Sequence, residues 1–371
     1  MMAAGLPHSY WLFVFDMFCT ASLCHLVVIT RWNPHAPSEH LASAPQNRHF
    51  GHVPRVGGAA IFAVFLLQSL FLARDDATGL TASYKLLLVA SLPVFVAGFI
   101  EDITGRITPK VRFGASVLSA ILSFYLLDAR IIRSDIPFID PLLNQFTLFS
   151  LVVTAFAVAG IAHSVNIVDG CNGLASLVSV IILSALCYVS HRVGDSALVF
   201  ISLTLIASVL GFFLLNYPYG LIFLGDGGAY FIGFIISQVA ILLVIRHPEV
   251  SAWFPFLLCF YPTFETVFSI YRRFSISKRS PMEADALHLH SLIMSRVVMN
   301  NPKLTYRENK LRKNYLTSPY LWFFNGVVAM VALWFYDSPL VLMGFYVVFI
   351  VIYIWVYSGI VNFRIRGSSV R

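Results

Sequence analysis

The sequence predicts an all-α, polytopic integral membrane protein, and three observations support that fold class. Hydrophobic residues make up 58% of the 371 residues, whereas charged residues make up 12%, about half the charged share of an average soluble domain. The mean hydropathy is +0.79. The apolar residues gather in long segments, most of them close to the roughly 20 residues that a spanning helix needs. We expect one transmembrane domain that covers residues 1–371.

About eleven apolar segments follow one another along the chain, and we interpret each as a spanning helix. The expected spans cover approximately residues 10–29, 57–73, 84–100, 113–127, 146–163, 174–189, 196–215, 229–245, 252–270, 319–335 and 340–360. We expect the first segment to be a span rather than a cleavable signal peptide, because no basic residue precedes it and no clear small-residue cleavage site follows it.

The basic residues predict how these spans are oriented in the membrane. If the N-terminus lies outside, 19 of the 25 Lys and Arg residues fall on the cytoplasmic side. Cytoplasmic loops are enriched in Lys and Arg, so the sequence predicts an external N-terminus, a cytoplasmic C-terminus and an odd number of spans. The net charge of +7 then reflects topology, and we expect no nucleic-acid partner.

The polar motifs fall in the loops predicted to be cytoplasmic. The first consists of Asn166, Asp169 and Asn172, every third residue of a glycine-bearing run between two apolar segments. In a helix or turn, side chains three residues apart lie on one face, which makes an oxygen-rich patch suited to a hard cation or a sugar hydroxyl. Alternatively, these residues cap a helix and form a turn, because Asx residues with glycine mark loops.

Carboxylates lie at two further boundaries between an apolar segment and the cytoplasm. Glu101 and Asp102 are adjacent at a helix end, where two carboxylates repel each other unless a cation or phosphate chemistry uses them. Asp226 has glycine on both sides, which lets the backbone approach a ligand closely while the carboxylate binds Mg²⁺. The alternatives are a hydrated helix end for the pair and an ordinary Asp-Gly turn for Asp226.

The longest predicted loop, residues 271–318, is basic and contains His288 and His290. Their spacing of two residues is poor for zinc compared with the four-residue spacing of a metalloprotease, so we favour an anion-binding loop. The alternative is a basic cytoplasmic loop with two incidental histidines. Before this loop, Glu265 follows Pro262, which indicates either a kinked ninth helix that lines the site or a satisfied carboxylate near a helix end.

Together, the motifs favour a site where a water-soluble phosphorylated substrate meets a lipid substrate. A secondary transporter is an alternative, but transport sites lie near the bilayer midplane on broken helices, whereas these motifs lie in loops and the spans carry few charges. A catalytically inactive membrane scaffold is a second alternative. The completeness of the motif set argues against it.

In this order, the motifs resemble those of the polyprenyl-phosphate N-acetylhexosamine-1-phosphate transferases, which include phospho-MurNAc-pentapeptide translocase and the transferases that initiate O-antigen and enterobacterial common antigen. The resemblance covers about His52 to Arg296. It implies an enzyme of the bacterial inner membrane that transfers a sugar-1-phosphate from a UDP-sugar to undecaprenyl phosphate at the cytoplasmic face. It also implies Mg²⁺, or alternatively Mn²⁺, release of UMP, and a role in starting a lipid-linked surface polysaccharide such as O-antigen. The sugar, the lipid chain length and a homodimeric state stay open.

The resemblance also assigns roles by position. The catalytic residues it implies are Glu101, Asp102, Asp169, Asp226, His288 and His290, with Asp226 and Asp169 as metal ligands. The substrate-binding residues that we expect with them are Arg55, Lys110, Asn166, Asn172, Asn216, Asp285 and Arg296. Glu101 stands where the family has the first of two aspartates, and Asn172 where it has a later aspartate. The His-x-His loop, rather than three histidines, favours a simple UDP-N-acetylhexosamine. Which of Glu101 and Asp102 acts as a base, and whether transfer takes one or two displacements, stays open.

Overall fold

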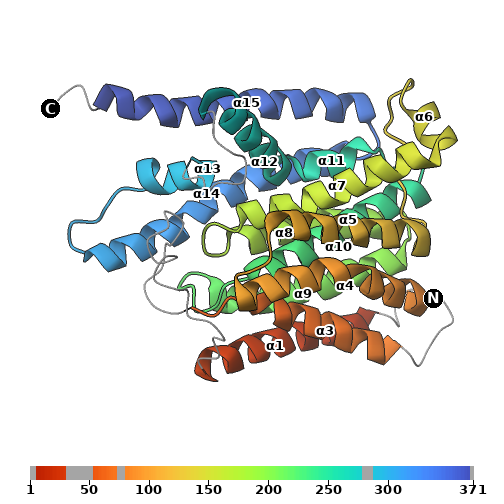
Figure 1. Ribbon diagram of the computed structural model, residues 1–371, viewed down its shortest axis with the longest axis horizontal. Helices are drawn as coiled ribbons and strands as arrows, with labels where there is room; N and C mark the ends of the chain where they lie inside the picture. Colours follow the sequence, from red (N-terminus) through yellow and green to blue (C-terminus); the bar gives the residue numbers. More distant parts are fainter. Residues whose placement is uncertain (1–5, 31–52, 73–79, 278–286, 368–371) are drawn as a thin grey trace.

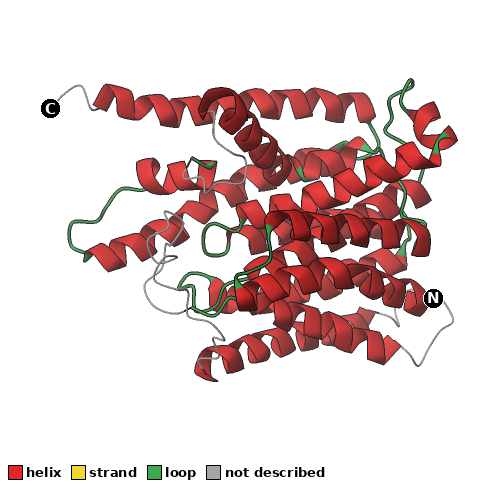
Figure 2. Cartoon of the chain, viewed as in Figure 1, coloured by secondary structure: helices red, strands yellow, loops and turns green. Residues whose placement is uncertain are grey.

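The structure is a computed structural model that describes residues 6–30, 53–72, 80–277 and 287–367. In these ranges the chain is an all-helical bundle, and no strand is present among them (Figure 2). Among the described residues, eight helices are long and apolar enough to cross a membrane. They are α1 (Leu6–Thr30), α4 (Leu80–Thr104), α7 (Thr147–Val168), α8 (Leu174–Arg192), α9 (Ser196–Asn216), α10 (Gly225–Arg246), α14 (Tyr306–Trp334) and α15 (Pro339–Gly367). The predicted polytopic all-α fold class is confirmed.

The other three expected spans also form helices, but these are shorter, less apolar or broken into two pieces. They correspond to the short helix α3 (Gly57–Phe71), to α5 (Pro109–Leu126), and to a pair formed by α11 (Trp253–Leu258) and α12 (Phe260–Arg272). The pair is broken because Pro262 has no backbone N–H, and in a continuous helix its ring would clash with the carbonyl of Leu258 four residues earlier.

The region 271–318 is more structured than the long loop expected from sequence. Its described part contains the π-helical turns η2 (Arg273–Ser277) and η3 (Ile293–Val297), the short helix α13 (Leu289–Leu292) and the first turns of α14. Helix α14 begins thirteen residues before its expected start at 319, because Thr305 and Glu308 form a capping box that satisfies the first free N–H groups. A further short helix, α6 (Asp140–Gln145), precedes α7.

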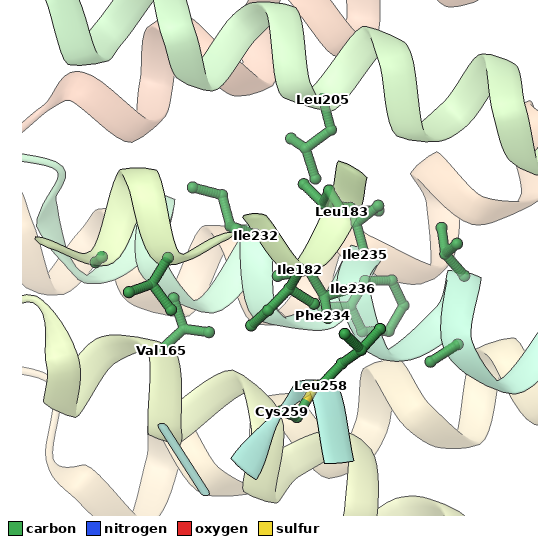
Figure 3. Close-up of a cluster of buried hydrophobic side chains, with 14 of the residues drawn as sticks. Val165, Ile182, Leu183, Leu205, Ile232, Phe234, Ile235, Ile236, Leu258 and Cys259 are labelled. Carbon is green, nitrogen blue, oxygen red and sulfur yellow. The ribbon is translucent and has the colours of Figure 1, made fainter. Parts of the chain in front are cut away.

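Helix α10 is the centre of the bundle, with α3, α4, α7, α8 and α9 packed around it (Figure 1). Its side chains are buried from Gly225 to Leu243. Figure 3 shows part of this core, in which Ile232 and Phe234 of α10 lie among side chains of α7, α8, α9 and α11. Burial on all sides explains why α10 is apolar all round rather than along one stripe.

Small residues set how closely helices approach the first turn of α10. A Cβ on Gly58 of α3 would fall on the backbone of Gly228, and a Cβ on Gly98 of α4 would fall on the backbone of Gly227. Glycine pairs of this kind let membrane helices pack backbone to backbone. The N-terminal end of α10 is therefore held tightly between α3 and α4.

Candidate active site

The candidate site is built around Asp226 in the first turn of α10. Arg112 of α5 donates to Asp226 Oδ2, and Asn166 Nδ2 of α7 donates to Asp226 Oδ1 at 2.8 Å. The exposed Arg55 places Nη2 at 3.9 Å from the same oxygen. Three segments far apart in the sequence therefore bring one amide and two guanidinium groups to one carboxylate.

The turn into α10 explains why glycine precedes Asp226. Gly225 has φ of +79°, a left-handed conformation that glycine adopts at little cost. A Cβ at this position would also collide with the Asp102 carboxylate and the Arg55 carbonyl oxygen. Gly225 thus allows both the change of direction and the close approach of α4 to α10.

Asp102 caps the N-terminus of α10 from the neighbouring helix α4. Its Oδ1 accepts from the backbone N–H of Asp226 at 2.8 Å, and its Oδ2 accepts from that of Gly227 at 2.9 Å. A carboxylate here satisfies two free N–H groups and interacts favourably with the helix dipole. Next to it, Glu101 Oε2 accepts from the backbone N–H of Ile107 at 2.6 Å, which fixes the turn between α4 and α5.

The segment from Pro54 to Gly58, which contains Arg55, reaches the site by pairing with the chain before α10. Phe223 N donates to Pro54 O at 2.8 Å, Gly57 N donates to Phe223 O at 2.9 Å, and Gly58 N donates to Leu224 O at 2.8 Å. These bonds hold the Pro54–Gly58 segment against the end of α10 and explain how Arg55 comes within reach of Asp226.

Asp169 ends α7 one turn beyond Asn166. Its carboxylate is half-buried and makes no side-chain hydrogen bond to another residue in the part of the chain that the structure describes. Burial raises the pKa of Asp169 to about 7, although the Arg55 charge acts to lower it. Asp169 is therefore a buried acidic group whose ionised form would be stabilised by a cation.

Asn172 and Asn216 lie next to the site, but their side chains hydrogen-bond to backbone groups. Asn172 Nδ2 donates to Pro218 O at 2.8 Å. Asn216 Oδ1 accepts from Gly173 N at 2.6 Å, and its Nδ2 donates to Ile222 O at 2.7 Å. Both side chains are buried, so the structure gives them a bracing role. Their contact with substrate stays a prediction.

The histidine loop lies against the turn that contains Asp169. The His288 and His290 rings stack with centroids 5.4 Å apart, and a Cβ on Gly170 would collide with the His290 imidazole. His288 Nδ1 lies 2.9 Å from Glu265 Oε1 of α12. The structure thus joins both histidines to the Asn-x-x-Asp-Gly turn.

The remaining predicted site residues are placed differently. Lys110 is exposed in the first turn of α5. Arg296 Nη1 donates to the Ile360 and Val361 carbonyl oxygens of α15 at 3.2 Å, which ties the loop to that helix. Asp285 lies outside the described residues.

Sequence reasoning missed three residues of the site. Arg112 counted only toward topology, yet its guanidinium group donates a hydrogen bond to Asp226. Asn314 of α14 accepts from Asn172 N at 2.7 Å through Oδ1, and Ser318 one turn later donates to Asn172 O at 2.6 Å. The four-residue spacing of these two polar residues, which places them on one helix face, is the signal that the sequence offered.

The residues present fit a magnesium ion that substrate phosphates also hold. Among the described residues, no group of three or more His, Cys, Asp or Glu side chains forms a metal site by itself. However, Mg²⁺ is usually bound by one or two carboxylates together with substrate phosphates. Two carboxylates could take this part. Burial raises the pKa of Asp169, whose side chain has no hydrogen-bond partner among the described residues, and Asp226 is hydrogen-bonded to Asn166, one turn before Asp169.

A polytopic helical bundle that gathers carboxylates, arginines and histidines at one end of its central helix suits a membrane enzyme that acts on phosphorylated groups. Comparison with known proteins gives the family. Residues 84–244 match glycosyl transferase family 4. Over 257 residues, 68% of this chain and 69% of the relative, the chain is 30% identical to a probable undecaprenyl-phosphate N-acetylglucosaminyl 1-phosphate transferase of Bacillus subtilis. It is also 28% identical to a phospho-N-acetylmuramoyl-pentapeptide-transferase of Streptococcus thermophilus over 221 residues, 56% of this chain and 62% of the relative.

The chain therefore belongs to glycosyl transferase family 4, in the polyprenyl-phosphate sugar-1-phosphate transferase superfamily. It is a membrane-bound phosphotransferase. The predicted superfamily and enzyme class are confirmed.

Proposed function

We propose that this enzyme transfers a sugar-1-phosphate of the N-acetylhexosamine type from a UDP-sugar to undecaprenyl phosphate and releases UMP. The product would start the assembly of a lipid-linked surface polysaccharide such as O-antigen. The convergence of Arg55, Arg112, Asn166 and Asp226 is the observation that carries the proposal, because it places two guanidinium groups beside a carboxylate at a helix end. The names of the relatives from Bacillus subtilis and Streptococcus thermophilus support the lipid and the N-acetyl sugar.

The proposed reaction is a displacement at phosphorus. An oxygen of the lipid phosphate forms a bond to the phosphorus that bears the sugar, and the bond from that phosphorus to the UMP oxygen breaks. The protein contributes positioning and charge stabilisation rather than covalent chemistry. Arg55 and Arg112 would interact with the donor diphosphate, and the histidine loop would stabilise negative charge on the departing UMP.

Magnesium, held by Asp169 and Asp226, would supply further charge neutralisation of the diphosphate. A strong protein base is not required, because a phosphate monoester has a second pKa near 6 and is largely dianionic at pH 7. Asp102 is poorly suited to that role, since both of its oxygens accept backbone N–H groups of α10. Its task is to hold Asp226 in place.

We infer that the N-terminal end of α10, where the site lies, is on the cytoplasmic side of a bacterial inner membrane. The segments around this end carry Arg55, Arg106, Lys110 and Arg112, and loops rich in Lys and Arg stay cytoplasmic. A UDP-sugar is made in the cytoplasm, so this orientation also places the site where its donor is available.

The experiment is UMP release by the purified protein in detergent with undecaprenyl phosphate, MgCl₂ and a panel of UDP-N-acetyl sugars. We expect release that requires both lipid and Mg²⁺, that identifies the sugar, and that disappears in Asp226→Asn. Glu249→Gln is the matched control, because Glu249 is exposed beyond the other end of α10. If no donor in the panel yields UMP from folded protein, a UDP-N-acetylhexosamine is not the donor and the proposal is wrong.

A further inference from the structure

Glu265 of α12 is a buried carboxylate with three hydrogen-bond donors around it. Its side chain is 1% exposed. Oε1 lies 2.9 Å from His288 Nδ1 and accepts from Leu289 N at 3.1 Å, while Oε2 accepts from the Tyr353 hydroxyl at 2.6 Å. A buried carboxylate is tolerated when hydrogen bonds replace its hydration. These three donors meet that requirement.

The contact with Glu265 fixes where His288 carries its proton. An ionised carboxylate only accepts hydrogen bonds, so the imidazole nitrogen that faces it must be the protonated one. Nδ1 therefore holds the proton, and Nε2, on the opposite side of the ring, is the nitrogen that presents a lone pair when the ring is neutral. A carboxylate behind a histidine is a recurring way to set the tautomer and orientation of the ring.

The His288 ring also orients His290, because the two rings stack. The rings of His288 and His290 are nearly parallel, with an interplanar angle of 6°. His290 in turn packs against Gly170 so closely that a Cβ there would strike its ring. A row of contacts thus runs from Glu265 through both histidines to the turn that carries Asp169.

Helix α15 supports the same row from the edge of the bundle (Figure 1). Besides the bond from Tyr353 to Glu265, the Tyr357 hydroxyl donates to Leu287 O at 3.1 Å, and Arg296 donates to two carbonyl oxygens of α15. Much of α15 is otherwise exposed on the outer side of the bundle. Its polar contacts are concentrated on the histidine loop.

We propose that Glu265 is the positioning residue of the His-x-His loop: it holds the proton of His288 on Nδ1 and directs Nε2 away from α12, with Tyr353 of α15 bracing the carboxylate. The link to catalysis rests on the proposed function, in which this loop contacts the donor. The tautomer itself does not depend on it.

The test combines a spectroscopic measurement with kinetics on the full-length protein in liposomes. ¹⁵N solid-state NMR of histidine-labelled protein, with His288→Asn to assign the signal, reports which nitrogen of His288 is protonated. We expect protonated Nδ1 in the wild type and loss of that state in Glu265→Gln. Wild-type His288 that is protonated on Nε2 alone overturns the proposal without the need for any Glu265 variant.

For kinetics, we expect kcat/KM for UMP release to fall about 10- to 100-fold in Glu265→Gln, the usual cost of losing a carboxylate behind a functional histidine. The double variant Glu265→Gln/His288→Asn should be no worse than His288→Asn alone, because residues that act through one another are not additive. Independent, multiplicative losses overturn the positioning role. Glu249→Gln is again the matched control. If the wild type releases no UMP, the proposed function fails, while the NMR result still decides the role of Glu265.

Discussion

Two Asp→Asn substitutions at this site are expected to have opposite effects on stability, although both should abolish UMP release. Asp102 accepts two backbone hydrogen bonds from the first turn of α10. Asp169 accepts none from a described side chain or backbone group. The substitutions are isosteric and lie in one site, so each is the matched control for the other.

The expected loss for Asp102→Asn follows from what an amide can still accept. Asn keeps one oxygen, and its NH₂ group then faces a backbone N–H donor. One hydrogen bond to a charged acceptor, worth about 1.5–3 kcal/mol, is lost, together with about 0.3–1 kcal/mol of interaction with the helix dipole. At pH 8, where carboxylates are ionised, the free energy of unfolding should fall, but by less than the sum of about 2–4 kcal/mol, because the neutral amide also avoids the cost of burying a charge.

The expectation for Asp169→Asn has the opposite sign and depends on pH. Burial raises the pKa of Asp169 to about 7, so folding favours the protonated carboxyl. The stability that this group contributes is complete below its ordinary pKa near 4 and is lost as pH rises through about 7. Asn is neutral at every pH. The variant should therefore exceed the wild type in stability at pH 8 by on the order of 2 kcal/mol, after a discount for partial exposure, and by less at pH 5.

The assay is thermal unfolding in detergent, followed by intrinsic tryptophan fluorescence without Mg²⁺, at pH 5 and pH 8. For a chain of this size, about 1 kcal/mol corresponds to a shift in apparent Tm of no more than about 2–4 °C. We expect a clear decrease for Asp102→Asn and an increase for Asp169→Asn at pH 8. If Asp102→Asn melts at or above the wild-type temperature, the capping role of Asp102 is refuted. Equal destabilisation by both variants would refute the comparison as a whole.

Three further expectations follow from the same contacts. Arg112→Lys should lower kcat/KM at least about tenfold, because lysine lacks the planar fork that binds carboxylate and phosphate, whereas Arg106→Lys on the exposed turn nearby should not; equal effects would contradict a specific role for Arg112. Gly170→Ala should destabilise the protein by about 1–3 kcal/mol through overpacking against His290, whereas a Cβ on Gly160 meets open space and Gly160→Ala, inside α7, should not destabilise it in the same unfolding assay. MgCl₂ should raise the apparent Tm of the wild type and EDTA should reverse the rise; an undiminished response in Asp226→Asn would exclude that carboxylate as a magnesium ligand.

The positions of the helices could be predicted from sequence because a membrane span is a local property. Apolar length and flanking polar residues placed most helices to within a few residues. The long N-terminal extension of α14 was missed, because residues 306–318 are polar and only the capping box of Thr305 and Glu308 shows that a helix begins there. The kink before Glu265 was foreseen from Pro262, since proline acts on its own backbone and needs no tertiary partner.

The types of residue in the site could also be predicted, but the partner of each could not. Lys110 and Arg112 are two residues apart and equally basic, yet on a helix they point in directions about 200° apart. Which of them meets Asp226 depends on how α5 packs against α7 and α10. In the same way, Asn172 and Asp169 belong to one motif, but Asn172 is engaged by Asn314 and Ser318, about 140 residues later in the chain.

The acidic residues of the site divide according to what their oxygens accept. Asp102 and Glu101 bind backbone N–H groups, and Glu265 binds a loop and a neighbouring helix. Protonation of a carboxylate engaged in this way weakens the hydrogen bonds by which it holds the backbone, and a buried N–H left without an acceptor costs about 1–3 kcal/mol. The Asp226 carboxylate instead faces an amide and two guanidinium groups, and the Asp169 carboxylate faces no hydrogen-bond donor among the described residues. Both can therefore bind a cation at a smaller structural cost. A loss of activity on replacing Asp102, Glu101 or Glu265 is therefore weak support for acid–base catalysis until the fold of the variant has been measured.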